Sequence, residues 1–233
     1  MTAPIHLQPA APLAERALLP GDPGRALLLA QLLLTDPKMF NHNRGLWGYT
    51  GIAADGAPLT IQSTGMGGPS AAIVIAELAD LGAARLIRVG TCGALDPSLQ
   101  LGELLIATQA IACDGTSRAL GANDRVRPDA ELTAALQAAA GRGAASGTVA
   151  STDLFYDGPE DEQQRWIDAG ALAVEMESAT LFALARKRRV RAATLLIVSD
   201  LLAPRRTRID PEALREAERR AGELAVRALP VSA

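Results

Sequence analysis

Residues 193–200 read ATLLIVSD and form the most hydrophobic strand-like run of the chain. An apolar run of this length that ends in polar residues predicts a buried strand of a central sheet. Ser199 and Asp200 close the run, so we expect Asp200 at the rim of the sheet in a desolvated setting. A desolvated carboxyl group is a candidate general acid, and the alternative is an Asp that caps a helix or a turn.

Similar short apolar runs alternate with helical patterns along most of the chain. Strands are predicted at 16–20, 47–53, 58–64, 85–90, 103–112, 146–151, 171–176 and 193–200. Helices are predicted at 24–35, 69–82, 128–141, 160–169, 177–188 and 211–228. This alternation predicts a three-layer α/β fold with a central sheet flanked by helices on both faces.

Turn signals refine this picture. The sequence Ala54-Asp55-Gly56 lies between two strand-like runs and predicts a hairpin, so the sheet is expected to be mixed. Residues 113–128 are rich in turn formers and charge, which predicts a loop that borders a site or lies on the surface. No repeat or low-complexity linker interrupts the chain, so we expect a single domain over residues 1–233.

The composition argues against several classes of protein. Of the 233 residues, 48% are hydrophobic and only 3% aromatic, and the net charge is -3, which argues against a nucleic-acid-binding protein. The 2 cysteines are too few for a disulfide framework, and no run reaches the roughly 18 apolar residues that span a membrane. The N-terminus has no basic segment followed by an apolar one, so we expect a cytoplasmic protein without a signal peptide.

Three strand ends are rich in glycine and hydroxyl groups: LLPGDPGRA at 18–26, STGMGGPS at 63–70 and LIRVGTCGAL at 86–95. Arg25 is expected in the first turn of a helix, where backbone N–H groups attract anions. Arg88 lies within an apolar strand, where a guanidinium needs an acid or an anion as its partner. Tight turns and a structural salt bridge explain these features one by one, but together they favour a shared anion pocket.

Two carboxylates stand two residues apart in the apolar run ALAVEMESAT, residues 171–180. At a strand end Glu175 and Glu177 are expected to face the same side of the sheet, because side chains alternate along a strand. Burial of a carboxylate is costly without hydrogen-bond donors, so the pair needs donors from a ligand or from the backbone.

Taken together, these stretches resemble the hexameric nucleoside phosphorylase family, which includes purine nucleoside, uridine and methylthioadenosine phosphorylases. The motifs that carry the resemblance, in order, are GDPGRA, NRGLWGYTG, STGMGGPS, IRVGTCGAL, STDLFY, VEMESATLFALA and IVSD, between about residue 4 and residue 202. The resemblance implies a partly barrel-like central sheet and a homo-oligomer, expected to be a hexamer built as a trimer of dimers. It also implies a nucleoside and inorganic phosphate as substrates, with no metal and no organic cofactor.

The resemblance also implies the residues of the site. The implied phosphate site is Gly21, Arg25, Arg88 and Thr91, completed by Arg44 from a neighbouring subunit. The implied nucleoside site is Phe155 on the base, Met176 and Glu177 at the ribose, Glu175 near the base, Ser199 beside Asp200, and His6 at a neighbour's ribose 5′ position. A ribose diol offers Glu177 two donors that offset its burial, whereas Glu175 holds either the base or a nearby backbone N–H group.

The implied reaction is the phosphorolysis of a purine nucleoside to free base and ribose 1-phosphate, as in purine salvage. In the purine enzymes of the family the residue that matches Asp200 protonates N7 of the leaving base. Those enzymes also carry an arginine after this Asp that assists the proton transfer. The matching position here is Ala213, so Arg208 or Arg215 would have to substitute, and Arg205 and Arg206 are expected to be surface charges.

The alternatives are a uridine or a methylthioadenosine phosphorylase. STGMGGPS, DGTS and EMESATL look closest to uridine phosphorylases, but those enzymes read uracil with a Gln and an Arg where this chain has Pro159 and Asp161. Gln164 and Arg165 follow later and would require a shifted loop. The Ser199–Asp200 ending is of the purine type, so purine nucleosides are the predicted substrates. The arginine cluster argues against a hydrolytic nucleosidase, and Asp200 argues against a non-catalytic binding protein.

Overall fold

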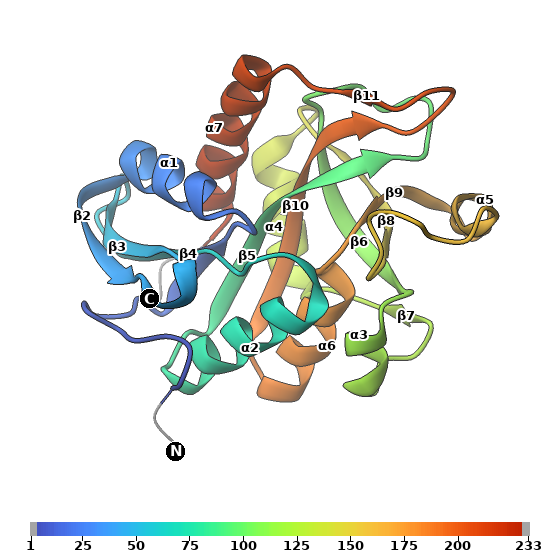
Figure 1. Cartoon of the computed structure of the whole chain (residues 1–233). Coiled ribbons are helices and arrows are strands. Elements are labelled where there is room, and N and C mark those ends of the chain that lie inside the picture. The colour runs from blue at the N-terminus through green and yellow to red at the C-terminus, as the bar shows by residue number, and fades with distance from the viewer. Residues whose placement is uncertain (1–3, 230–233) are drawn as a thin grey trace.

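The computed structural model describes residues 4–229, and its centre is one mixed sheet in the order β11-β10-β6-β8-β9-β5-β1-β4-β3-β2, with β7 paired to β6 (Figure 1). The strands are β1 (Arg16–Leu19), β2 (Leu34–Asn41), β3 (Gly48–Ala53), β4 (Pro58–Gln62), β5 (Arg85–Ala94), β6 (Leu104–Ala112), β7 (Arg125–Val126), β8 (Ala145–Ser151), β9 (Ala171–Glu175), β10 (Arg191–Leu201) and β11 (Thr207–Arg208). Because β10 also pairs with β5, the strands β10, β6, β8, β9 and β5 close into a ring. The predicted mixed, partly barrel-like sheet is therefore confirmed.

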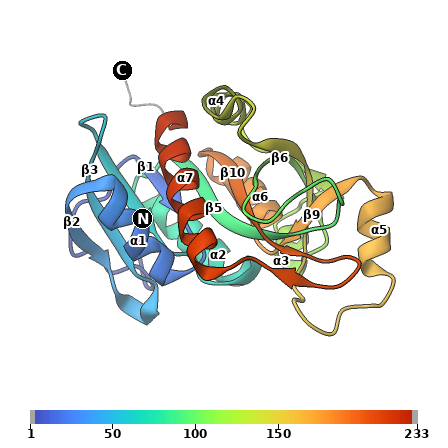
Figure 2. The same ribbon diagram turned by 90° about the horizontal axis from the view of Figure 1, so that it is seen from above.

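Helices cover both faces of this sheet. They are α1 (Pro23–Leu33), α2 (Gly67–Asp80), α3 (Gly115–Ala119), α4 (Ala130–Ala140), α5 (Glu162–Asp168), α6 (Ser178–Arg188) and α7 (Pro211–Ala228), with a short 3-10 turn η1 (Asn43–Gly45). Figure 1 shows α2 and α6 together on one side and α1 and α7 on the other. The strands β2 and β3 lie at one end of the molecule and α5 at the opposite end, in this view and from above (Figure 2).

Strand β10 is buried on both faces, which explains its continuous apolar sequence. Leu196 and Val198 are buried in the core cluster that includes residues of α2 and α6. Leu195 and Ile197 are buried in the cluster that includes residues of α1, α4 and α7. A strand whose two faces are both covered by helices is apolar at successive positions instead of at every second one.

Every predicted strand and helix is present, and the differences lie in exposed or short elements. The predicted helix 24–35 ends at Leu33, and the chain enters β2, which was not predicted. Strand β2 is mostly exposed and carries polar residues, so it lacks the apolar signal of the inner strands. The predicted hairpin is present, since β3 and β4 pair antiparallel on either side of residues 54–57.

The stretch 113–128 is not the loose loop that its composition predicts. It contains α3 and β7, and the side chains of Asp114 and Ser117 are fully buried. Asp114 caps α3 by accepting from the backbone N–H group of Ser117 at 2.7 Å, and it also accepts from the hydroxyl group of Thr180 at 2.8 Å. The polar residues of this segment thus satisfy one another inside the protein. Within residues 4–229, no helix is long and apolar enough to cross a membrane.

Candidate active site

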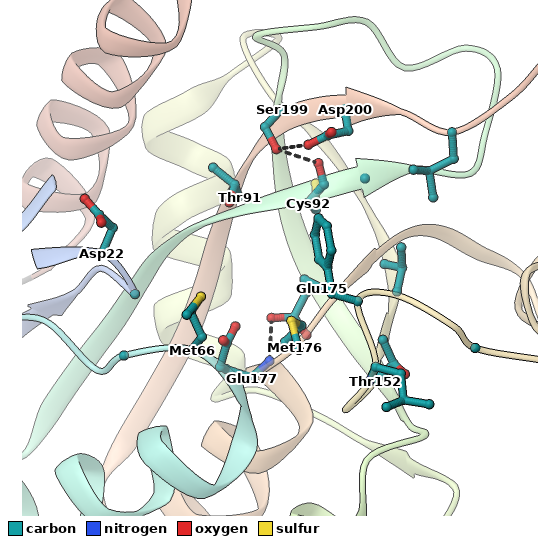
Figure 3. Close-up of a pocket in the computed structure, with 18 of the residues that line it drawn as sticks. Asp22, Met66, Thr91, Cys92, Thr152, Glu175, Met176, Glu177, Ser199 and Asp200 are labelled. Carbon is teal, nitrogen blue, oxygen red and sulfur yellow. Dashed lines mark hydrogen bonds between the residues drawn. The ribbon is translucent and has the colours of Figure 1, made fainter. Parts of the chain in front are cut away.

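A cavity of about 750 Å³ opens where the strands β1, β4, β5 and β10 end. These strands run parallel to one another, so their carboxyl ends meet at one edge of the sheet, where ligands bind in open α/β sheets. Eleven of the predicted site residues line it: Gly21, Arg25, Arg44, Arg88, Thr91, Phe155, Glu175, Met176, Glu177, Ser199 and Asp200. Figure 3 shows Glu175, Met176 and Glu177 on one side of this space and Ser199 and Asp200 on another.

One part of the cavity, which we call the strand corner, comprises Gly21, Gly65, Arg88, Glu175 and Glu177. A Cβ atom on Gly21 would lie 3.2 Å from the carbonyl oxygen of Gly65 and 3.8 Å from Nη1 of Arg88. The two glycine turns therefore approach each other and Arg88 at close range. Helix α1 begins directly after the first turn, where the Asp22 side chain accepts from the backbone N–H group of Arg25 at 2.7 Å.

Arg88 is 5% exposed and contacts both acids of the strand corner. Its Nε donates to Oε2 of Glu175 at 3.3 Å, and its Nη2 donates to Oε2 of Glu177. The guanidinium folds over Gly90, where a Cβ atom would lie only 2.7 Å from Nη2. The remaining nitrogen, Nη1, is buried and has no hydrogen-bond partner among the described residues. The predicted salt bridge exists, and it leaves one donor directed toward the Gly21 turn.

The two carboxylates have different surroundings. Glu175 is held by the protein, since it accepts from the backbone N–H groups of Glu177 at 2.9 Å and Ser178 at 3.0 Å and from the hydroxyl group of Ser151. Glu177 accepts from the backbone N–H group of Gly67 at 2.5 Å through Oε1 and from Arg88 through Oε2. Burial raises the pKa of Glu177, and the nearby Arg88 charge opposes that rise. The sequence left open whether Glu175 holds the base or a backbone N–H group. In the structure, Glu175 accepts from backbone N–H groups.

The other part of the cavity, the strap corner, comprises Phe155, Ser199, Asp200, Arg206 and Arg208. Asp200 is buried at the end of β10, as predicted. The hydroxyl group of Ser199 donates to Oδ2 of Asp200 at 2.8 Å, a bond drawn in Figure 3. A strap, residues 202–206, then turns the chain back so that β11 pairs antiparallel with the end of β10.

Arg206 is exposed, as expected for a surface charge, but it also contacts the site. Its Nε donates to Oδ1 of Asp200 at 2.9 Å, and its guanidinium carbon lies 4.4 Å from the centroid of the Phe155 ring. Arg208 also reaches Oδ1 of Asp200, with its Nε at 3.4 Å. Both arginines line the cavity, whereas Ala213 and Arg215 are exposed residues of α7 outside its lining.

The segment after Phe155 decides one of the sequence alternatives. Pro159 lines the cavity, whereas Gln164 and Arg165 are exposed and do not. On α5, Gln164 donates to Asp168 at 2.8 Å and Arg165 pairs with Asp161 at 3.4 Å. Gln164 and Arg165 therefore do not form a uracil-reading pair, although the neighbouring Gln163 lines the cavity.

The comparisons with known proteins identify the family of this chain. Residues 15–230 match the family model described as the phosphorylase superfamily. The chain belongs to this superfamily. A DeoD-type purine nucleoside phosphorylase of Alkaliphilus metalliredigens is 39% identical over 196 residues, which cover 82% of this chain and 84% of that protein. One from Exiguobacterium sibiricum is 38% identical over 208 residues, covering 85% and 87%. A guanosine phosphorylase of Halorubrum lacusprofundi is 38% identical over 188 residues, covering 79% and 77%.

His6 is the one predicted site residue that does not line the cavity. Its Nδ1 lies 2.8 Å from Oε1 of Glu77 on α2. The same carboxylate accepts from the backbone N–H groups of Ile5, His6 and Leu7 at 3.1, 3.1 and 2.6 Å. Glu77 thus fixes the first described segment of the chain on the surface of α2. Arg44, which was expected from a neighbouring subunit, is exposed in η1 and lines the cavity of its own chain.

Sequence reasoning missed two residues besides Arg206. Glu218 of α7 binds Nε of Arg25 at 2.7 Å, and both side chains are 9% exposed, so the pair fixes Arg25 at the cavity wall. Ser151 ends β8 and binds Glu175. A buried Glu on an amphipathic helix was the available signal for Glu218, but its partner is far away in the sequence. Among residues 4–229, no group of three or more His, Cys, Asp or Glu side chains could hold a metal ion.

Proposed function

We propose that this protein catalyses the phosphorolysis of purine nucleosides to free base and ribose 1-phosphate. The observation that carries the proposal is a single cavity that joins the unpartnered Nη1 of Arg88 to the buried carboxylates of Glu177 and Asp200. An anion needs the donor of Arg88, a sugar diol needs the acceptor oxygens of Glu177, and a leaving base needs Asp200 as its acid. The curated relatives named purine nucleoside phosphorylase, which cover most of the chain, support the same assignment.

Phosphate is assigned to the strand corner. An unpartnered buried donor is unfavourable, so Nη1 of Arg88 favours an anion beside the Gly21 turn. Arg25 and Thr91, which also line the cavity, complete the pocket. Arg88 keeps its bonds to Glu175 and Glu177 while it holds the phosphate, so the anion site and the acid pair form one network.

The ribose is assigned to Glu177 and Met176. Each oxygen of Glu177 has one protein donor, and a carboxylate oxygen accepts about two hydrogen bonds, so two sugar hydroxyl groups can donate to it. Met176 supplies an apolar surface in the same wall. Glu175 acts as a support, because its bonds to backbone N–H groups fix the turn that carries Glu177.

The purine base is assigned to the strap corner, with its ring on Phe155 and N7 toward Asp200. Phosphate attacks the anomeric carbon as the bond from that carbon to N9 breaks, and Asp200 gives its proton to N7. The proton neutralises the charge that develops on the leaving base, and a positioned acid of this kind accelerates a reaction by roughly 10² to 10⁴. Phosphate is the only co-substrate in this scheme.

We extend the proposal to the assembly, a hexamer built as a trimer of dimers in which His6 acts in a neighbour's site. Glu77 presents His6 on the surface of α2, outside the cavity of its own chain, which favours a role across an interface. Mixing the inactive variants Asp200→Asn and His6→Ala provides the test. Shared sites regain activity in mixed oligomers, whereas sites confined to one chain do not.

The experiment that tests the reaction is the release of free base from inosine, adenosine, uridine and methylthioadenosine, with and without phosphate. We expect release only with phosphate, and faster release from the purine ribosides than from uridine. Release that needs no phosphate would contradict the phosphorylase assignment, and faster cleavage of uridine would contradict the purine assignment. The rate of base release from methylthioadenosine measures whether the cavity accepts a thioether at the 5′ position of the ribose.

A further inference from the structure

We propose that Glu218 of α7 is a positioning residue for phosphate, because it holds the guanidinium of Arg25 through Nε and leaves both Nη groups to the anion. The inference rests on the proposed function, which takes phosphate as the anion bound beside Arg25. It starts from a buried carboxylate that the reaction itself does not use, since Glu218 does not line the cavity.

Arg25 is held at both ends. Its backbone N–H group donates to the carboxylate of Asp22 at 2.7 Å, and its Nε donates to Oε1 of Glu218 at 2.7 Å. Glu218 is the one partner that this guanidinium has among the described residues. Arg25 lines the cavity and Glu218 does not, so the guanidinium lies between the carboxylate and the space where the anion binds.

The packing of α7 on α1 brings this pair together (Figure 2). A Cβ atom on Gly222 of α7 would lie 2.6 Å from Cδ2 of Leu29 and 2.9 Å from Cδ1 of Leu33, so the two helices approach closely there. Residues four apart lie on the same face of a helix, which places Glu218 with Gly222 and Arg25 with Leu29. The contact between the helices therefore fixes the carboxylate beside the arginine, one turn before the point of closest approach.

The chemistry of the anion site requires such an arrangement. Arg88 offers the anion only Nη1, because its Nε and Nη2 bind Glu175 and Glu177. A guanidinium bound at Nε still has the N–H groups of both Nη atoms, so Arg25 is the larger source of donors. A long side chain loses rotamer freedom when it binds a ligand, and Glu218 removes that freedom from Arg25 before phosphate arrives.

The test is the KM for phosphate, measured at saturating inosine in two variants that both lack the charge of Glu218. Glu218→Gln keeps an acceptor oxygen within reach of Nε, whereas Glu218→Ala keeps none, so the ratio of their KM values isolates the orientation of Arg25. Ordering one arginine side chain is worth about tenfold in binding, so we expect the alanine variant to have a KM for phosphate about 10 times that of the glutamine variant. The KM for inosine should be the same in both.

The controls separate orientation from the stability of α7. Leu224→Ala removes a buried apolar side chain from the same helix, so it should lower Tm without raising the KM for phosphate. Glu223 pairs with Arg219 on the exposed side of α7, and its alanine and glutamine variants should have equal KM values for phosphate.

A second comparison covers an alanine variant that does not fold. Glu218→Asp keeps the charge but is one methylene group shorter, so its KM for phosphate should exceed that of the unmodified enzyme. In an Arg25→Ala background, the alanine and glutamine variants of Glu218 should have equal KM values for phosphate, because no guanidinium is left to orient.

Three results would overturn the inference: equal KM values for phosphate in the alanine and glutamine variants, no rise in Glu218→Asp, or a difference that persists in the Arg25→Ala background. In each case the unmodified enzyme would still release base only with phosphate. Base release by the unmodified enzyme without phosphate would overturn the proposed function instead.

Discussion

The strand corner and the strap corner share one cavity but are built in opposite ways. In the strand corner, Arg88, Glu175 and Glu177 are 5%, 4% and 5% exposed and satisfy one another through ion pairs and backbone N–H groups. In the strap corner, Phe155 is 51% exposed, and Arg206 comes from a short connection between two strands. Arg88 and Glu175 of the strand corner thus belong to strands of the sheet, whereas Phe155 and Arg206 of the strap corner lie on connecting segments.

The largest effect is expected from a change in the strand corner. Arg88→Met leaves Glu175 and Glu177 as buried carboxylates without their cation, and breaking a buried pair costs about 3–5 kcal/mol. We expect a marked fall in Tm together with the loss of phosphate-dependent base release. The matched control is Arg85→Met on the same strand, since Arg85 pairs with Glu15, whose side chain is 52% exposed. An equal loss of stability in the two variants would contradict the special role of the strand corner.

In the strap corner we expect activity to be lost while the fold stays intact. Asp200→Asn keeps the shape of the side chain but cannot supply a proton, so turnover of inosine should fall by roughly 10² to 10⁴. Binding of the nucleoside should persist, and Tm should change far less than in Arg88→Met. Calorimetric titration with inosine in the absence of phosphate, beside a thermal melt, measures both. Unchanged turnover would remove Asp200 from the role of acid.

The buried Glu177 predicts a dependence on pH. Burial raises its pKa, and ribose binding requires the ionised form, so the acid limb of kcat/KM for inosine should lie above the usual glutamate range. In Glu177→Gln this limb should disappear, together with most of the activity. A limb that remains in the variant would belong to another group.

The same shift has a definite sign for stability. Because the folded state raises the pKa of Glu177, its contribution to stability is complete below the unfolded-state pKa and is lost as the pH rises through the folded-state pKa. Melting the unmodified protein and Glu177→Gln across this range should therefore give a Tm difference that changes with pH. A constant difference would contradict the raised pKa.

The smallest effect concerns the first described segment, outside both corners. Glu77→Gln replaces with a neutral amide the carboxylate that accepts from the N–H groups of residues 5–7 and from His6. Although burial opposes it, these donors lower the pKa of Glu77, so the stability that it provides is lost as the pH falls through that lowered pKa. We expect a small fall in Tm, and faster hydrogen exchange at residues 5–7. Unchanged exchange would mean that other contacts hold the segment.

The sequence predicted the inner strands and the strand corner because both depend on local signals. The apolar run of β10 and the glycine turns near Gly21 and Gly65 place their elements directly. The contact of Arg206 with Asp200 was not predicted because it depends on how the strap folds back, and no periodicity describes such a connection. The role of Glu218 was missed for a similar reason, since its partner Arg25 is 193 positions away.

The most direct test of the central claim is the identity of the sugar product. When inosine is cleaved in phosphate buffer, phosphorus NMR should detect ribose 1-phosphate in an amount equal to the hypoxanthine released. Enzymatic assay of the same sample should detect no free ribose. Free ribose as the main product, at a rate independent of phosphate, would contradict the account, because the unpartnered donor of Arg88 would then have no anion to bind.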